Sequence, residues 1–281
     1  MLRTKHVTKY ESDVRIGLQD LFDSAKAKMQ HTGDLLVCQQ NGFMGYSESP
    51  TIGIGEEGLN NMATLNSISF RGIGDVTNDN NYFKKLDGFF NGTTEFEYSL
   101  QREKGTYLNI WESSYFLRIL TQTVNLANGL EYDWDLNVSA MTPSGKNRHV
   151  REQVIKRLNV LPTIQKIVST AYNRNIRNAI AHSQYHCVQG GIWYDNFGSD
   201  KYADLQAIGF EDWEQKYIMS YFLFIGVFQT LKQIKDEFYY PLSKSLKGKG
   251  IPIRIPGKNK KWTEKYIYPN QNGETWRFVK T

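Results

Sequence analysis

The chain has 281 residues and a net charge of +5, with 40% hydrophobic and 22% charged residues, which is typical of a folded protein with a sizeable core. Its longest dense apolar stretch, residues 217–228, is shorter than the ~20 residues of a bilayer-spanning helix, and its first residues are too polar for a signal peptide. Its two cysteines, Cys38 and Cys187, exclude a disulfide framework and suit a reducing compartment. We therefore expect a cytoplasmic protein with no membrane segment.

Hydrophobic spacing predicts helices in the first half of the chain. Apolar residues recur at helical intervals over residues 8–30 and again over 107–128, where Gly129 ends the pattern. Residues 39–93 are rich in glycine and asparagine, which favours an irregular region with short strands. Residues 130–147 are expected to form a loop.

The second half is also predominantly helical until its last forty residues. A helical pattern near His149 is interrupted by Pro162, which starts or kinks a new helix. From Thr163 one apolar face continues to Ile180, and the sequence GIWYDNFG after it is typical of a small hairpin. Asp212 is a good cap for a long helix over 212–238, which Pro241 follows. Residues 251–279 have the alternation of β-strands.

The positive charge of the protein is concentrated in its last residues. Residues 243–281 contain ten lysines and arginines but two acids, for a net charge of +8, whereas residues 1–242 have a net charge of −3. Interleaved cations and aromatic rings suit single-stranded nucleic acid, so we expect Lys258, Lys260, Lys261 and Trp262 to bind RNA. The alternative is a solvated hairpin whose aromatic rings pack on the main domain.

A polar stripe follows the apolar face that ends near residue 180. Arg174, Asn178 and His182 are spaced four residues apart, and the side chain of Arg177 can reach the turn that contains His182. Arginine binds phosphate oxygens with a planar fork, histidine transfers protons near neutral pH, and asparagine orients a phosphate or hydroxyl. Such residues suit phosphate chemistry, with Arg174 also contacting RNA.

Two other interpretations of this stripe remain open. The arginines and the histidine can simply decorate an exposed helix end, where cations favour the negative end of the helix dipole. His182 and His186 are four residues apart, as in zinc sites, but no third ligand is evident, so we expect no metal. Gly53, Gly55 and Gly58 have GxGxxG spacing but lack the βαβ context of a dinucleotide site, so we expect no cofactor. We expect Arg177 and His182 to lie off the apolar face, so that truncating either opens no cavity in the core.

The segment Arg177-Asn178-Ala179-Ile180-Ala181-His182 resembles the RNxxxH motif of the HEPN superfamily. A helix that opens with WESSYFLRIL, residues 111–120, is similar to the partner helix of these bundles. The long helix over 212–238 follows the motif helix, as another helix does in this superfamily. We expect an N-terminal helix with an irregular Gly/Asn-rich region over 1–96, and a small basic β appendage over 243–281. Between them, the resemblance implies a mainly α fold with a HEPN-like helical domain over 97–242. It also implies that two copies dimerise around a shared cleft.

Many members of this superfamily are metal-independent endoribonucleases of toxin–antitoxin, abortive-infection or CRISPR systems. The resemblance assigns the catalytic positions to Arg177, Asn178 and His182, with Glu112 on the partner helix. His182 would transfer the proton, Arg177 would stabilise the phosphorane, and Asn178 would position the phosphate. The expected partners are RNA, a second copy of the chain, and an antitoxin or activator protein. The alternative is a non-catalytic HEPN-like interaction or RNA-binding protein.

Overall fold

The computed structural model describes residues 2–40, 42, 94–188, 190–197, 205–256, 262–269 and 276–278. Within these residues the fold is mainly helical with small antiparallel sheets, as the sequence predicts. Nearly all of the Gly/Asn-rich region over 39–93 lies outside the described residues. None of the helices in the described part combines the length and apolarity that a bilayer crossing demands.

The helices and strands follow one another along the chain in this order: α1 (Thr4–Lys28), α2 (Asp34–Gln39), α5 (Thr94–Glu112), α6 (Ser114–Ala127), α7 (Pro143–His149), η1 (Val150–Ile155), η2 (Lys156–Val160), α8 (Pro162–Ala171), α9 (Arg174–Ala181), β1 (Tyr185–Val188), β2 (Gly191–Tyr194), β3 (Ala207–Gly209), α10 (Phe210–Ile234), η3 (Lys235–Tyr239), α11 (Tyr240–Ser245), β4 (Ile251–Pro256), β5 (Trp262–Pro269) and β6 (Trp276–Arg277).

Several helices end where the sequence pattern did not predict an end. The helix expected over 107–128 is two helices, because α5 ends at Glu112 and α6 begins at Ser114. The apolar face expected to run unbroken to Ile180 is also divided, since Asn173 caps a new helix, α9. Serine and asparagine side chains compete for backbone hydrogen bonds, which favours helix ends at such positions.

Two further boundaries differ from the expectation. Pro241 does not follow the last helix but lies in α11, which continues from α10 and η3 with helical backbone at Tyr239 and Tyr240. The expected loop over 130–147 contains the start of α7, capped by the Thr142 side chain, which accepts from the Gly145 N–H at 3.1 Å. By contrast, the expected helix near the N-terminus and the helix start at Pro162 are confirmed.

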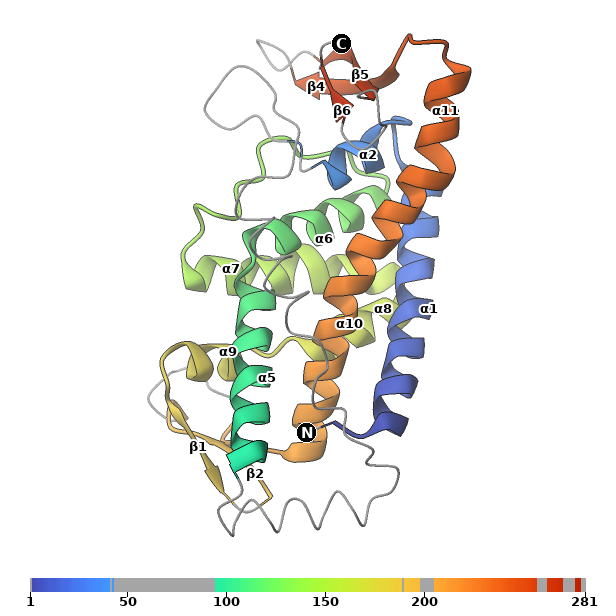
Figure 1. The fold of residues 1–281 in the computed structure, drawn as a ribbon. Helices are drawn as coiled ribbons and strands as arrows, with labels where there is room; N and C mark the ends of the chain where they lie inside the picture. Colours follow the sequence, from blue (N-terminus) through green and yellow to red (C-terminus); the bar gives the residue numbers. More distant parts are fainter. Residues whose placement is uncertain are drawn as a thin grey trace. The chain divides into compact units, whose positions relative to one another are not determined.

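The described residues form two compact units. The first takes residues 2–17, 94–113 and 163–224, and the second takes residues 18–40 with 42, 114–162 and 225–278. The first unit therefore contains α5, α8, α9, the sheet β1-β2-β3 and the start of α10. In Figure 1, α9 and the β1–β2 hairpin lie beside α5.

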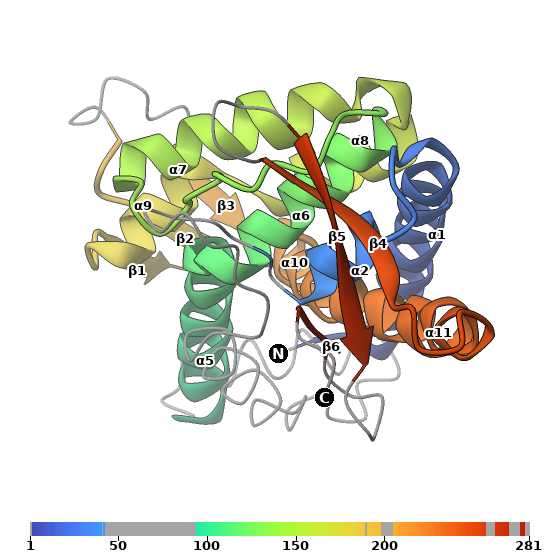
Figure 2. The ribbon, with the colours of Figure 1, turned by 90° about the horizontal axis from the view of Figure 1, so that it is seen from above.

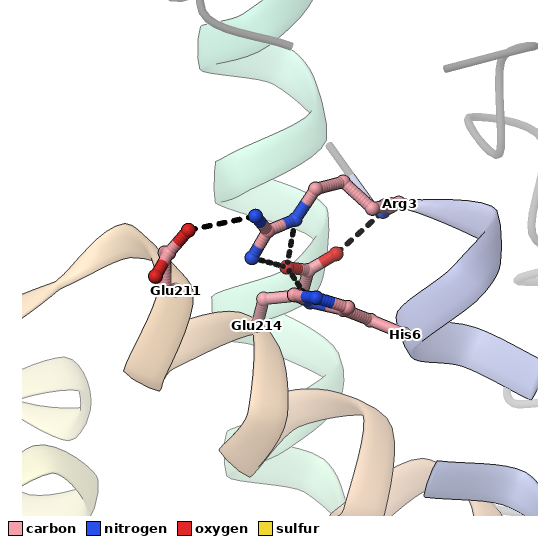
Figure 3. A network of polar contacts seen from close by, with 4 residues as sticks. All are labelled: Arg3, His6, Glu211 and Glu214. Atoms are coloured by element: carbon pink, nitrogen blue, oxygen red, sulfur yellow. Dashed lines mark hydrogen bonds and ion pairs between the residues drawn. The ribbon is translucent and has the colours of Figure 1, made fainter. Parts of the chain in front are cut away.

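A buried ion pair attaches the N-terminal segment to α10 within the first unit. Arg3 and Glu214 are both almost fully buried, and the Nε of Arg3 donates to Oε2 of Glu214 at 2.9 Å. Glu211 binds the same guanidinium at 2.7 Å, and the Nδ1 of His6 lies 2.9 Å from Glu214 (Figure 3). A buried carboxylate needs such partners, because desolvation otherwise costs several kcal/mol.

The second unit buries the apolar face of the C-terminal hairpin. Ile251, Ile253 and Ile255 alternate along β4 and are buried, and Ile267 of β5 is opposite Ile251. The start of α2 lies close to β4 (Figure 2). A Cβ on Gly33 would lie 2.7 Å from the carbonyl oxygen of Pro252 and 2.2 Å from the side chain of Ile253. The three expected β-segments are confirmed, and their isoleucines and Trp276 belong to a core.

A buried histidine gives the second unit a pH-dependent element. His149, 7% exposed, lies 2.8 Å from the hydroxyl of Thr121, which itself donates to the carbonyl of Leu117 at 2.7 Å. The hydroxyl has one proton, so the Nε2 of a neutral His149 donates to it. Burial lowers the pKa of His149 to about 4, with a smaller contribution from Arg157.

This histidine should make the effect of its own replacement depend on pH. Below pH ~6.5 the unfolded chain protonates residue 149 while the native chain does not, so wild type loses stability as the pH falls toward 4. His149→Gln removes this loss. We expect its destabilisation, measured by urea unfolding, to be about 1–2 kcal/mol smaller at pH 5 than at pH 7. An equal destabilisation at both pH values would contradict the assignment.

Candidate functional site

The site is built on α9, which is separated from α8 by a short non-helical segment that ends in an N-cap. The Oδ1 of Asn173 accepts from the N–H of Ile176 at 3.0 Å, as an N-cap does. Tyr107 of α5 binds this segment. Its fully buried hydroxyl donates to the carbonyl of Ala171 at 3.1 Å and accepts from the N–H of Asn173 at 2.9 Å. Burial raises the pKa of Tyr107, which keeps this hydroxyl protonated. A helix of the same unit thus fixes where α9 begins.

Arg177 is buried, against the expectation that it lies on the surface. Its side chain is 3% exposed, and its Nη2 is ion-paired with Oε1 of Glu112, the last residue of α5. Burial lowers the pKa of Arg177, but arginine stays protonated in proteins, and Glu112 supplies the counter-charge. The sequence did not predict this burial because Glu112, the partner of Arg177, lies 65 residues earlier in the chain.

Arg177 also fixes the orientation of its neighbour. Its Nη1 donates to Oδ1 of Asn178 at 2.7 Å. A guanidinium has no acceptor, so the amide oxygen of Asn178 must face it. The Nδ2 amide group of the half-buried Asn178 is then the end that remains for a ligand. An N–H donor at this position suits an anion such as a phosphate.

His182 lies at the end of α9 and is exposed. The helix ends there in a Schellman arrangement, because the N–H of Gln184 donates to Ala179 at 2.8 Å and the N–H of Ser183 donates to Ile180 at 3.2 Å. Ser183 has φ 54°, a left-handed conformation that favours glycine. This strained residue fixes the exit from the helix directly after His182. No glycine or asparagine marks it in the sequence.

The four residues assigned by the resemblance therefore lie in one unit. Glu112, Arg177 and Asn178 form a chain of contacts, and His182 is one helical turn after Asn178. Arg174, half-buried in the first turn of α9, shares the stripe with Asn178 and His182, as the four-residue spacing predicts. Within the described residues, no three histidine, cysteine or acidic side chains gather as a metal site would require.

The RNA-binding residues expected in the C-terminal region are only partly described. Lys258, Lys260 and Lys261 lie outside the described residues. Trp262 is 37% exposed, and the guanidinium of Arg254 lies 5.2 Å from its ring centre. Trp276, in contrast, is buried. The aromatic residues of this region thus divide between a packed face and an exposed one.

The sequence was compared with family models and with curated proteins, and the fold with solved structures; no family model, curated protein or solved structure matches.

Loss of Arg177 should destabilise the fold. Arg177→Ala leaves Glu112 without its counter-charge and opens a cavity, and breaking a buried pair typically costs ~3–5 kcal/mol. Because the Glu112 side chain is 33% exposed, we expect a loss of about 2–3 kcal/mol in urea unfolding. The matched control is Arg102→Ala on the exposed side of α5, with a loss within ~0.5 kcal/mol. Equal stability of the two variants would contradict the buried pair.

Proposed function

We propose that the chain is a metal-independent endoribonuclease that cleaves RNA by 2′-hydroxyl transesterification, as a toxin or an anti-phage, abortive-infection effector. The observation that carries the proposal is the joined arrangement of Glu112, Arg177 and Asn178 beside the exposed His182. These are the residues that the resemblance to the HEPN superfamily assigns to catalysis, and they come from two helices of one unit.

Each residue has a distinct role in this proposal. The imidazole of His182 accepts the proton of the ribose 2′-hydroxyl or donates one to the leaving 5′-oxygen. The Nδ2 group of Asn178 donates to a phosphate oxygen, and Arg174 adds positive charge beside it. Arg177 positions Asn178 while it is paired with Glu112, and stabilises the phosphorane directly when that pair opens. The product carries a 2′,3′-cyclic phosphate.

The proposed partners follow from the same resemblance. RNA is the substrate, a second copy of the chain completes a shared cleft, and an antitoxin or activator protein regulates it. Two-fold symmetry would bring two His182 side chains to one site. A cytoplasmic location suits such an effector.

A non-catalytic HEPN-like interaction or RNA-binding protein is the second candidate. The burial of Arg177 favours it, because a guanidinium that is 3% exposed and neutralised by Glu112 also serves as a structural tie. Under this alternative the polar stripe on α9 stabilises the fold or binds RNA without cleaving it.

Replacement of His182 separates the two candidates. We expect His182→Ala to reduce RNA cleavage by about 10²–10⁴-fold, because proton transfer contributes that much. The fold should persist, since His182 is exposed and unstrained changes on the surface cost within ~0.5 kcal/mol. The assay uses purified protein and mixed RNA with EDTA present, followed by end-group analysis for the cyclic phosphate.

The matched control is Lys166→Ala, which alters an exposed residue of α8 in the same unit and should leave cleavage unchanged. Cleavage that persists in His182→Ala would rule out the mechanism, and the absence of cleavage by wild type with every RNA tested would favour the second candidate.

The basic C-terminal residues are proposed to add affinity for RNA. Removing the whole segment would also remove Ile251, Ile267 and other core residues, so charge replacement is the cleaner experiment. We expect the triple change of Lys258, Lys260 and Lys261 to glutamine to weaken RNA binding. The slope of log K against log salt should fall by about 2, because fewer counterions are released. The triple change of Lys244, Lys247 and Lys249 removes the same charge, and an equal effect there would contradict a specific RNA path.

A further inference from the structure

The hairpin that follows α9 has two unlike faces. The strands pair with Tyr185 opposite Tyr194 and His186 opposite Trp193. Tyr185 packs inward, where the Nζ of Lys104 lies 3.9 Å from its ring centre and its hydroxyl donates to Gln101 at 3.2 Å. On the opposite, outer face, four residues near the open end of the hairpin are exposed: Gln184, His186, Trp193 and Asp195.

His186 on this outer face is oriented by a carboxylate. Its Nδ1 lies 2.9 Å from Oδ1 of Asp195, and the N–H of Asp195 donates to the carbonyl of Gln184 at 2.9 Å, which holds the two strands in register there. An ionised carboxylate accepts only, so Nδ1 carries the proton. The second ring nitrogen, Nε2, is then free of a proton in the neutral imidazole and can accept one.

Stability does not account for this pair. Both side chains are more than half exposed, at 54% and 52%, and ion pairs with such exposure contribute little to folding. The arrangement does determine the tautomer and the direction of the ring, which is what a histidine needs to transfer protons. The 40% exposed ring of Trp193 is directly opposite His186 in the hairpin, and exposed aromatic rings can stack with unpaired bases.

His186 is also close to His182 along the chain. They are four positions apart, so their Cα atoms are at most roughly 14 Å apart, and the left-handed turn at Ser183 shortens this distance. Both side chains are exposed and both belong to the first unit. This spacing is short enough for both imidazoles to contact one phosphodiester.

We propose that His186, held by Asp195, is the second proton-transfer group of this site, and this inference rests on the proposed function. One imidazole takes the proton of the 2′-hydroxyl while the 2′-oxygen forms a bond to phosphorus. The bond from phosphorus to the 5′-oxygen then breaks. The other imidazole, protonated, gives its proton to that 5′-oxygen. The products are a 2′,3′-cyclic phosphate and a 5′-hydroxyl. In this proposal the second proton-transfer group comes from the same chain as His182, in place of the His182 of a second copy.

The first measurement is a binding experiment that needs no cleavage. The full chain, labelled with ¹⁵N in histidine, is titrated with uridine 3′-monophosphate and followed by NMR. We expect the imidazole signals of His182 and His186 to shift together with one dissociation constant. In Asp195→Ala the spectrum should show that His186 loses its preference for the tautomer with the proton on Nδ1. A shift at His182 alone overturns the proposal but leaves the proposed function intact.

The second measurement is single-turnover cleavage of RNA. We expect His186→Ala to lose at least about 10²-fold in rate, as loss of an acid–base group does. The matched control is Gln184→Ala, two residues away on the same outer face, which should stay within about twofold of wild type. A His186→Ala variant that cleaves RNA at the wild-type rate overturns the proposal, even where His182→Ala is inactive. Absence of both NMR shifts, with no cleavage by wild type, overturns the proposed function and this inference together.

Discussion

The buried charge of Arg177 is the constraint on which the arrangement of the first unit depends. A guanidinium removed from water needs an anion within contact distance, because an unpaired buried charge costs several kcal/mol. Glu112 satisfies this need from the last residue of α5, so that the end of α5 must lie against α9. Tyr107, five residues before Glu112 on α5, forms hydrogen bonds with the backbone between α8 and α9. The two contacts together fix both the start of α9 and its rotation about its own axis.

The same constraint determines which polar groups face outward. Because Glu112 and the Asn178 oxygen occupy the guanidinium, the outward groups of α9 are the amide nitrogen of Asn178 and the imidazole of His182. The stripe of Arg174, Asn178 and His182 expected from four-residue spacing therefore exists, but the neighbouring Arg177 is buried in the protein. A structural ion pair and a proton-transfer site are compatible here, since the first holds the second in place. The same geometry suits RNA cleavage and RNA binding without cleavage. Proton transfer by His182 is what distinguishes the two functions.

Helical periodicity was sufficient to predict the positions of most helices, and it was least informative at their ends. The helix near the N-terminus, the start at Pro162 and the β-segments after residue 250 follow from apolar spacing and proline. The breaks at Ser113 and Asn173 were missed, because apolar residues continue at helical spacing across them. Asn173 before Arg174 was a recognisable N-cap signal. The burial of Arg177 had no local signal, since its partner Glu112 lies 65 residues earlier and only the fold brings them together.

Local and long-range interactions contribute differently to the candidate site. Residues 173–195 contain the N-cap, the RNxxxH segment, the left-handed turn at Ser183 and the His186–Asp195 pair, all held by contacts within that stretch. Glu112 and Tyr107 attach this stretch to α5 from outside it. The orientation of His186 thus depends on hairpin register, whereas that of Asn178 depends on the buried ion pair. Because the two histidines are positioned by separate interactions, a change that loosens α9 need not alter the ring of His186, and the two groups can be perturbed one at a time.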